Sequence, residues 1–197
     1  MGLTYANMSM SLDGYVAGPN VSVGNGMGDG GDQLHDWMFV GMSDEEIGPF
    51  LESLLKGTGA FVMGRTMLDV GIGPWGDNPS FHAPVFVVTH RPAEPIQRQG
   101  GTTYTFVTDG LHAAMDRARE AAGDQDVRVE GGGMIVREAL RSGLVDELRL
   151  HVVPILLGGG TPLFTGPEDR AINLAGDGTV DEYGVSHLRL KTKGTGG

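Results

Sequence analysis

The chain has 197 residues, with 14 Lys and Arg against 25 Asp and Glu, a formal charge of −11 and no cysteine. This charge argues against binding to nucleic acid or to an anionic membrane surface, because both depend on basic residues. The absence of cysteine excludes disulfides, a thiol nucleophile and a thiolate metal site. No apolar run is long enough to span a membrane, and no signal-peptide pattern is present, so we expect a cytoplasmic protein.

The first third of the chain contains one predicted strand, a long loop and two predicted helices. Residues 3–11 form the strand, and residues 18–32, rich in Gly, Asn and Asp, form the loop. Residues 33–40 place apolar side chains at helical spacing, which predicts a short helix. A capping-box pattern at residues 43–46 starts the second helix. Within it, Pro49 predicts either a kink or a helix that begins at Pro49 itself.

Strands and helices alternate through the middle of the chain. Apolar runs predict strands at residues 60–63, 85–88 and 103–107, the last followed by a helix that Thr108 and Asp109 are placed to cap. A further strand begins at Val127 and leads into three glycines and a helix, which Gly143 is placed to end.

Two more strands are predicted near the C-terminus, at residues 145–157, with a bend or bulge at Pro154, and at residues 185–191. The alternation of strands and helices predicts an α/β fold with a mainly parallel central sheet. Because no helix is predicted between the last two strands, we expect an antiparallel C-terminal edge. Residues 1–191 are predicted to form a single domain, and residues 192–197 a frayed tail.

The glycine triplet Gly131-Gly132-Gly133 follows a β-branched strand and opens an amphipathic helix. Glycine lets the backbone come close to a ligand. The first turn of a helix offers free N–H groups and the positive end of the helix dipole. Glycine triplets also occur in plain turns, but this order of strand, glycines and helix favours a phosphate site.

Two other segments follow predicted strands, Gly64-Arg65-Thr66 and Thr89-His90-Arg91. In an open parallel sheet, ligands bind at the carboxyl ends of the strands. Hydroxyl and guanidinium groups suit a phosphate. A single arginine is usually a solvated surface residue, yet three such strand ends together predict a site for a large phosphorylated ligand.

Candidate substrate contacts lie earlier in the chain. Asp13 is either a plain turn aspartate or a ligand contact. His35 and Asp36 place two titratable groups beside Trp37, on which a flat heterocycle could stack, although its spacing also fits core packing. The six histidines are scattered and no metal-binding motif appears, so no metal site is predicted.

These motifs, in order, make the chain resemble the dihydrofolate reductase-like proteins, in particular the reductase domain of the riboflavin-biosynthesis deaminase/reductase. The matching segments cover nearly the whole chain, and they are residues 10–17, 62–66, 87–92, 129–133, 143–150 and 156–164. The resemblance implies a three-layer fold with a mostly parallel sheet that binds NADPH. It also implies a homodimer.

The resemblance assigns roles residue by residue. The cofactor would contact Gly64, Arg65, Thr66, Thr89, His90 and Arg91, with basic groups near its 2′-phosphate, and its pyrophosphate would lie on Gly131, Gly132, Gly133, Met134 and Ile135. Ser11 and Asp13 would line the cleft between nicotinamide and substrate. No segment of this sequence resembles the deaminase half. Asp32 and Asp36 lie in the region where dihydrofolate reductases place the carboxylate that holds the pterin, and neither is assigned to that role.

The sequence therefore predicts an NADPH-dependent reductase that transfers hydride to a small flat heterocycle resembling a pterin, a pyrimidine or a flavin precursor. Asp13 and Asp36 are the candidate catalytic acids, with His35 or ordered water as alternatives; Ser11, Asp13, His35 and Trp37 are the candidate substrate contacts. The alternatives are a non-catalytic module that binds a nucleotide, pterin or flavin on the same fold, and a structural dimer whose glycine loops bind nothing.

Overall fold

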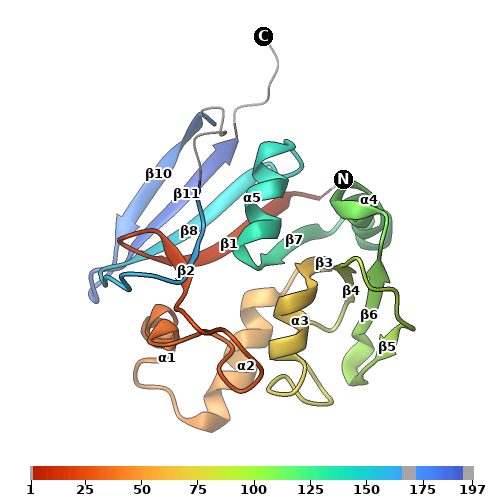
Figure 1. Ribbon diagram of the computed structural model, residues 1–197, viewed down its shortest axis with the longest axis horizontal. Helices are drawn as coiled ribbons and strands as arrows, with labels where there is room; N and C mark the ends of the chain where they lie inside the picture. Colours follow the sequence, from red (N-terminus) through yellow and green to blue (C-terminus); the bar gives the residue numbers. More distant parts are fainter. Residues whose placement is uncertain (1, 166–171, 193–197) are drawn as a thin grey trace.

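The computed structural model describes residues 2–165 and 172–192. Within them, the main sheet has nine strands in the order β10-β11-β8-β1-β7-β3-β4-β6-β5 (Figure 1). Their bounds are β1 (Thr4–Ser11), β3 (Thr58–Gly64), β4 (Pro84–Val88), β5 (Ile96–Gln97), β6 (Thr103–Val107), β7 (Asp126–Gly131), β8 (Glu147–Val153), β10 (Leu174–Val180) and β11 (Ser186–Thr192). Two short strands, β2 (Tyr15–Ala17) and β9 (Thr161–Pro162), pair with each other.

The helices lie on both faces of this sheet. They are α1 (Asp36–Phe39), α2 (Asp44–Leu55), α3 (Arg65–Gly71), α4 (Gly110–Ala122) and α5 (Gly133–Arg141), with 3-10 turns at Gly31–Leu34 and Gln99–Gly101. The described residues contain no helix long and apolar enough to cross a membrane.

The sheet confirms the predicted fold class. From β8 through β1, β7, β3 and β4 to β6, neighbouring strands run parallel. β11 pairs antiparallel with β8, which is the predicted edge, and β10 extends that edge as an antiparallel partner of β11. At the other end, β5 pairs antiparallel with β6. β5 and β10 were not among the predicted strands.

Alternating side chains divide the core between the two faces. Ala60 and Val62 of β3 belong to a cluster with apolar residues of α4 and α5, such as Met115 and Val136. Phe61 and Met63 of the same strand point the other way and pack with Leu68 of α3 and the loop that follows it. The sheet is therefore the middle of three layers, with α4 and α5 on one face and α3 on the other.

The predicted N-terminal helices differ from those observed. The capping box is present, because the Ser43 and Glu46 side chains each bond the other residue's backbone. Helix α2 begins at Asp44 and contains Pro49, so the alternative start at Pro49 is wrong. Pro49 is the sixth residue of the helix, beyond the first turn whose N–H groups lack acceptors, so it removes one hydrogen bond within the helix. The single helix predicted at residues 33–40 is a 3-10 turn followed by the four residues of α1.

The C-terminal boundaries also differ. The strand predicted at residues 145–157 is shorter, since β8 ends at Val153, directly before Pro154. Proline has no N–H to continue the ladder. Thr192 was assigned to the frayed tail but is the last residue of β11, where its hydroxyl donates to the carbonyl of Val145 over 2.8 Å. Residues 193–197 of the predicted tail lie outside the described residues.

Candidate functional site at the carboxyl edge of the sheet

The predicted cofactor segments meet at neighbouring strand ends. β7, β3 and β4 are adjacent and parallel, so the glycine triplet and the segments beginning at Gly64 and Thr89 lie along one edge. Contact is close, because a Cβ placed on Gly64 would lie 3.0 Å from Cγ1 of Ile135 and 3.8 Å from the Gly131 carbonyl oxygen. The structure thus brings together the three segments that the sequence singled out.

The glycine turn has the backbone that a close ligand approach requires. Gly131 has a φ of +132°, a conformation that side chains rarely permit. A Cβ on Gly133 would lie 2.9 Å from Cγ2 of Val16. By contrast, a Cβ on Gly132 would meet no described atom within 4 Å. Helix α5 begins immediately afterwards at Gly133. The N–H of Ile135 donates to the Gly132 carbonyl, so the N–H groups of Gly133 and Met134 are the ones without an acceptor in the helix and available to a ligand.

Two arginines converge on Asp69 at the neighbouring strand ends. The Arg65 guanidinium donates from Nε to Asp69 over 2.6 Å and lies 5.1 Å from the ring centre of Phe106. Arg91, at the end of the neighbouring strand, donates to the other oxygen of Asp69 over 3.1 Å. Asp69 therefore holds both predicted phosphate contacts together and leaves one net positive charge in this group of three.

The remaining predicted cofactor residues lie on the same edge. Thr89 is buried, and its hydroxyl oxygen accepts a hydrogen bond of 3.0 Å from the backbone N–H of Arg91, which shapes the turn after β4. Thr66 and His90 are exposed to solvent. Met134, in the first turn of α5, is 69% exposed despite its apolar side chain. These exposed groups are available to a ligand along the edge.

Ser11 and Asp13 serve contacts within the protein in this conformation. The buried Ser11 hydroxyl donates to Asp13 over 2.6 Å and accepts from the backbone N–H of Tyr15 over 2.9 Å. The Asp13 carboxylate also accepts from the N–H groups of Leu157 and Gly158. The hydrogen bond from Ser11 has the largest effect and lowers the pKa of Asp13; burial opposes it, and the two N–H groups add to the lowering. An ionised, fully engaged carboxylate is a poor proton donor at neutral pH.

The other substrate candidates surround α1. Asp36 is exposed in its first turn. Burial lowers the pKa of the partly buried His35, and the charges of Asp32 and Asp36 oppose that effect only in part. Trp37 donates from its indole N–H to the carbonyl of Leu34 over 3.0 Å, and its ring packs against other side chains of the protein.

Those partners are two histidines that sequence reasoning did not select. His151 and His187 lie directly opposite each other on β8 and β11, with their Nδ1 atoms 2.8 Å apart. Their ring centres lie 5.0 and 4.9 Å from that of Trp37. Nε2 of His151 lies 2.9 Å from Oδ1 of Asn7, and Nε2 of His187 lies 3.0 Å from Oδ2 of Asp181. The pairing depends on strand register, which sequence patterns leave open.

The environment of His151 makes stability sensitive to pH. Burial, then the charge of His187, lowers the pKa of His151 from 6.5 to about 4. The unfolded chain binds this proton more readily, so the contribution is present above pH 6.5 and is lost as the pH falls towards 4. Allowing for partial exposure, we expect a loss of about 2 kcal/mol in the free energy of unfolding.

Urea unfolding across this pH range measures the loss. In His151→Gln the free energy of unfolding should depend less on pH between 6.5 and 4. His112→Gln, at an exposed position of α4, should keep the wild-type slope. An unchanged slope in His151→Gln would show that another group titrates here.

The histidines belong to a larger polar strip, formed by Asn7, Arg128, Glu130, Arg149, His151 and His187. Leucines that alternate with His151 and His187 pack on the α4 and α5 side, so the strip faces the other way, towards α1. Glu130, the last residue before the glycines of the turn, forms an ion pair with Arg128. Burial raises the pKa of the Glu130 carboxyl although Arg128 opposes it.

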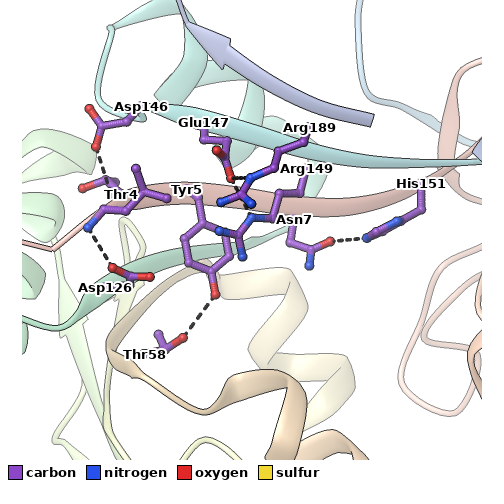
Figure 2. A network of polar contacts seen from close by, with 11 residues as sticks. Thr4, Tyr5, Asn7, Thr58, Asp126, Asp146, Glu147, Arg149, His151 and Arg189 are labelled. Atoms are coloured by element: carbon purple, nitrogen blue, oxygen red, sulfur yellow. Dashed lines mark hydrogen bonds and ion pairs between the residues drawn. The ribbon is translucent and has the colours of Figure 1, made fainter. Parts of the chain in front are cut away.

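At the end of the strip where β8 starts, a buried carboxylate accepts hydrogen bonds from two arginines (Figure 2). Glu147 accepts hydrogen bonds of 2.8 Å from both Arg149 and Arg189, and the Arg149 guanidinium lies 3.9 Å from the ring centre of Tyr5. The Tyr5 hydroxyl in turn lies 3.2 Å from that of Thr58 on β3. A hollow of about 670 Å³ opens beside Glu147 and Arg189. It lies at the start of β1 and β8, away from the candidate site.

Comparison with solved structures defines the class of fold. A dihydrofolate reductase from Enterococcus faecalis, complexed with NADP(H) and RAB-propyl, has a TM-score of 0.52 and 15% identity over 97% of this chain and 96% of that one. A putative riboflavin biosynthesis protein from Shewanella sp. PV-4 has a TM-score of 0.69 and 24% identity over 97% and 99%. The fold is therefore dihydrofolate reductase-like.

Sequence comparison then defines the family. Residues 4–191 match the RibD C-terminal domain, and the chain belongs to this family. The uncharacterized protein YyaP of Bacillus subtilis (strain 168) is 24% identical over 178 residues, which cover 85% of this chain and 82% of that protein. The family and the fold are therefore those that the sequence predicted.

Proposed function

We propose that the chain is an NADPH-dependent reductase that acts on a small flat heterocycle of the pterin, pyrimidine or flavin-precursor type. The observation that carries this proposal is the arrangement of the glycine turn and the Arg65–Asp69–Arg91 group on adjacent strand ends. The glycine turn suits a pyrophosphate, through its glycine backbone and the helix N–H groups. The group of Arg65, Asp69 and Arg91 suits the additional 2′-phosphate, through its guanidinium groups.

The protein's own part in this reaction is placement. The open space at Gly132 and the first turn of α5 would hold the pyrophosphate, and Arg65 and Arg91 would hold the 2′-phosphate. NADPH, when bound, supplies the hydride. Substrate would lie on the polar strip, near His35 and Trp37, where side chains from β1, β7 and β8 provide donors and acceptors for ring nitrogen and oxygen atoms.

Calorimetric titration with NADPH and NADH tests the proposal directly. We expect preferential binding of NADPH, followed by loss of its absorbance when a suitable pterin, pyrimidine or flavin is supplied. Binding of neither dinucleotide would contradict the reductase assignment. A bound pterin or flavin without NADPH oxidation would instead favour a non-catalytic binding module. One observation that favours this second function is that the Asp13 carboxylate accepts hydrogen bonds from within the protein. The homodimer stays a prediction.

Arg65 distinguishes the two dinucleotides. Arg65→Ala removes a guanidinium that Asp69 and Phe106 hold in place, so we expect the Kd for NADPH to rise about tenfold. NADH has no 2′-phosphate, and its Kd should change less than about twofold. Arg117→Ala, which removes an exposed partner of Asp109 on α4, is the matched control. Equal losses for both dinucleotides would rule out the 2′-phosphate role of Arg65.

A further inference from the structure

The chain of hydrogen bonds through the two histidines holds more protons than two neutral imidazoles can supply. Oxygen atoms of Asn7 and Asp181 accept at the two outer ends, so His151 and His187 each donate from Nε2. Rings protonated only at Nε2 would present two bare Nδ1 acceptors to each other. With the Asn7 oxygen facing His151, the Nδ1 contact of 2.8 Å requires a third proton, and the pair then carries one positive charge.

The surroundings place that charge on the His187 side. Asp181 lies beside His187, and although burial acts against it, the hydrogen bond from His187 lowers the pKa of Asp181 and keeps it ionised. On the other side, burial and neighbouring charges lower the pKa of His151 to about 4. The charged or titratable groups that act on His151 are His187, Arg128 of β7, His35 beside α1 and Arg149 of β8.

This pair lies beside the strand that separates it from the cofactor turn. β1 pairs with β8 on one side, with Ser9 opposite His151, and with β7, which leads into Gly131, on the other. The Asn7 amide extends from β1 to the Nε2 of His151 (Figure 2). Trp37, a predicted substrate contact, packs on the imidazoles. His151 thus presents an N–H between the predicted substrate residues and the cofactor strand.

We propose that His151 donates to the substrate the proton that accompanies hydride transfer, and that His187 and Asp181 are positioning residues that hold a second proton ready. This inference rests on the proposed reductase function. It gives the role of proton donor to His151. Asp13 is poorly suited to that role because backbone N–H groups engage its carboxylate.

The proposed step balances as follows. An acceptor nitrogen or oxygen of the substrate takes the place of the Asn7 oxygen at Nε2 of His151. Hydride from NADPH adds to the carbon of the C=N or C=O bond, NADP⁺ forms, and the Nε2 proton of His151 passes to the nitrogen or oxygen. The shared proton settles on Nδ1 of His151, which leaves both imidazoles neutral. Water returns one proton after the product leaves.

The proton count is tested without substrate. In the full chain labelled with ¹⁵N-histidine, NMR at pH 7 should show His187 protonated on both nitrogens and His151 protonated on Nε2 alone. Asp181→Asn should abolish the doubly protonated state, whereas His112→Gln on α4 should preserve it. Two neutral rings in the wild type would overturn the proposal, because the Asn7 amide would then donate to His151.

Delivery of the proton is tested by turnover of NADPH with a dihydropterin, a ribosylaminopyrimidinedione and a flavin as probes. His151→Gln should lower kcat at least about a hundredfold, the scale of general acid catalysis, while the variant stays folded and its Kd for NADPH is unchanged. His187→Gln should shift the pH profile of kcat to lower pH, an effect that a merely structural role would not produce. His112→Gln should match the wild type.

Failure of the proposed function and failure of the proton assignment give different results. If the wild type binds no NADPH, or oxidises it with none of the probes, the proposed function fails and the proton delivery fails with it. If the wild type turns over and His151→Gln keeps its kcat, only the proton assignment is overturned. Glu130 is the other buried acid near the glycine turn, and burial raises the pKa of its carboxyl. The proton assignment is also overturned if Glu130→Gln abolishes the fall of kcat at high pH while His151→Gln keeps it.

Discussion

Replacing Gly132 by valine is expected to weaken NADPH binding about a hundredfold while leaving the protein folded. Gly132 has a φ of −71° and a ψ of −173°, which residues with side chains adopt readily. A Cβ at this position meets no described atom within 4 Å, so we expect the fold to accept a side chain there. The same space lies before the first N–H groups of α5, where the pyrophosphate is proposed to bind. Loss of charge-assisted hydrogen bonds there costs about 2–3 kcal/mol.

Calorimetric titration and thermal melting of Gly132→Val measure the two effects separately. Gly73→Val is the matched control, because a Cβ there also meets no described atom within 4 Å and the residue lies outside the glycine turn. Gly131→Ala should behave differently and lose stability, since its φ of +132° disfavours any side chain. An unchanged affinity in Gly132→Val would move the pyrophosphate away from this turn.

Local patterns predicted the parts of the site that depend on consecutive residues. The strand, glycine triplet and helix at residues 127–141 are contiguous, so apolar periodicity and glycine chemistry are sufficient to predict their order. The same applies to the capping box of Ser43 and Glu46. Because parallel strands end at one edge, the shared location of the segments at Gly64, Thr89 and Gly131 followed from the fold class.

Features that depend on strand pairing were not predicted. β10 contains two glycines, lacks alternating apolar residues and is held by its pairing with β11. The contact of His151 with His187 needs an exact register between β8 and β11, and the two residues are 36 positions apart in the chain. Asp69 could have been found, because it lies four residues after Arg65, but only once a helix is recognised after β3.

Glu147→Ala is expected to lower the free energy of unfolding by about 2–3 kcal/mol, a fall of roughly 5–10 °C in Tm. Only 2% of the Glu147 side chain is exposed, and it is the shared acceptor for Arg149 and Arg189. Burial alone would raise the pKa of Glu147, but hydrogen bonds from the two arginines outweigh that effect and lower it. Removing the carboxylate leaves two guanidinium groups facing each other across β8 and β11 without their counter-charge.

The exposed pair of Asp109 and Arg117 provides the control for this effect. Their side chains are 64% and 45% exposed, so Asp109→Ala should change the free energy of unfolding by less than about 1 kcal/mol. Glu147→Gln keeps the shape of the side chain and isolates the contribution of its charge. Since Arg149 also lies over the Tyr5 ring, whose hydroxyl contacts Thr58, the loss should extend from β8 and β11 to β1 and β3. Equal losses in Glu147→Ala and Asp109→Ala would show that burial of this carboxylate contributes nothing to the stability of the sheet.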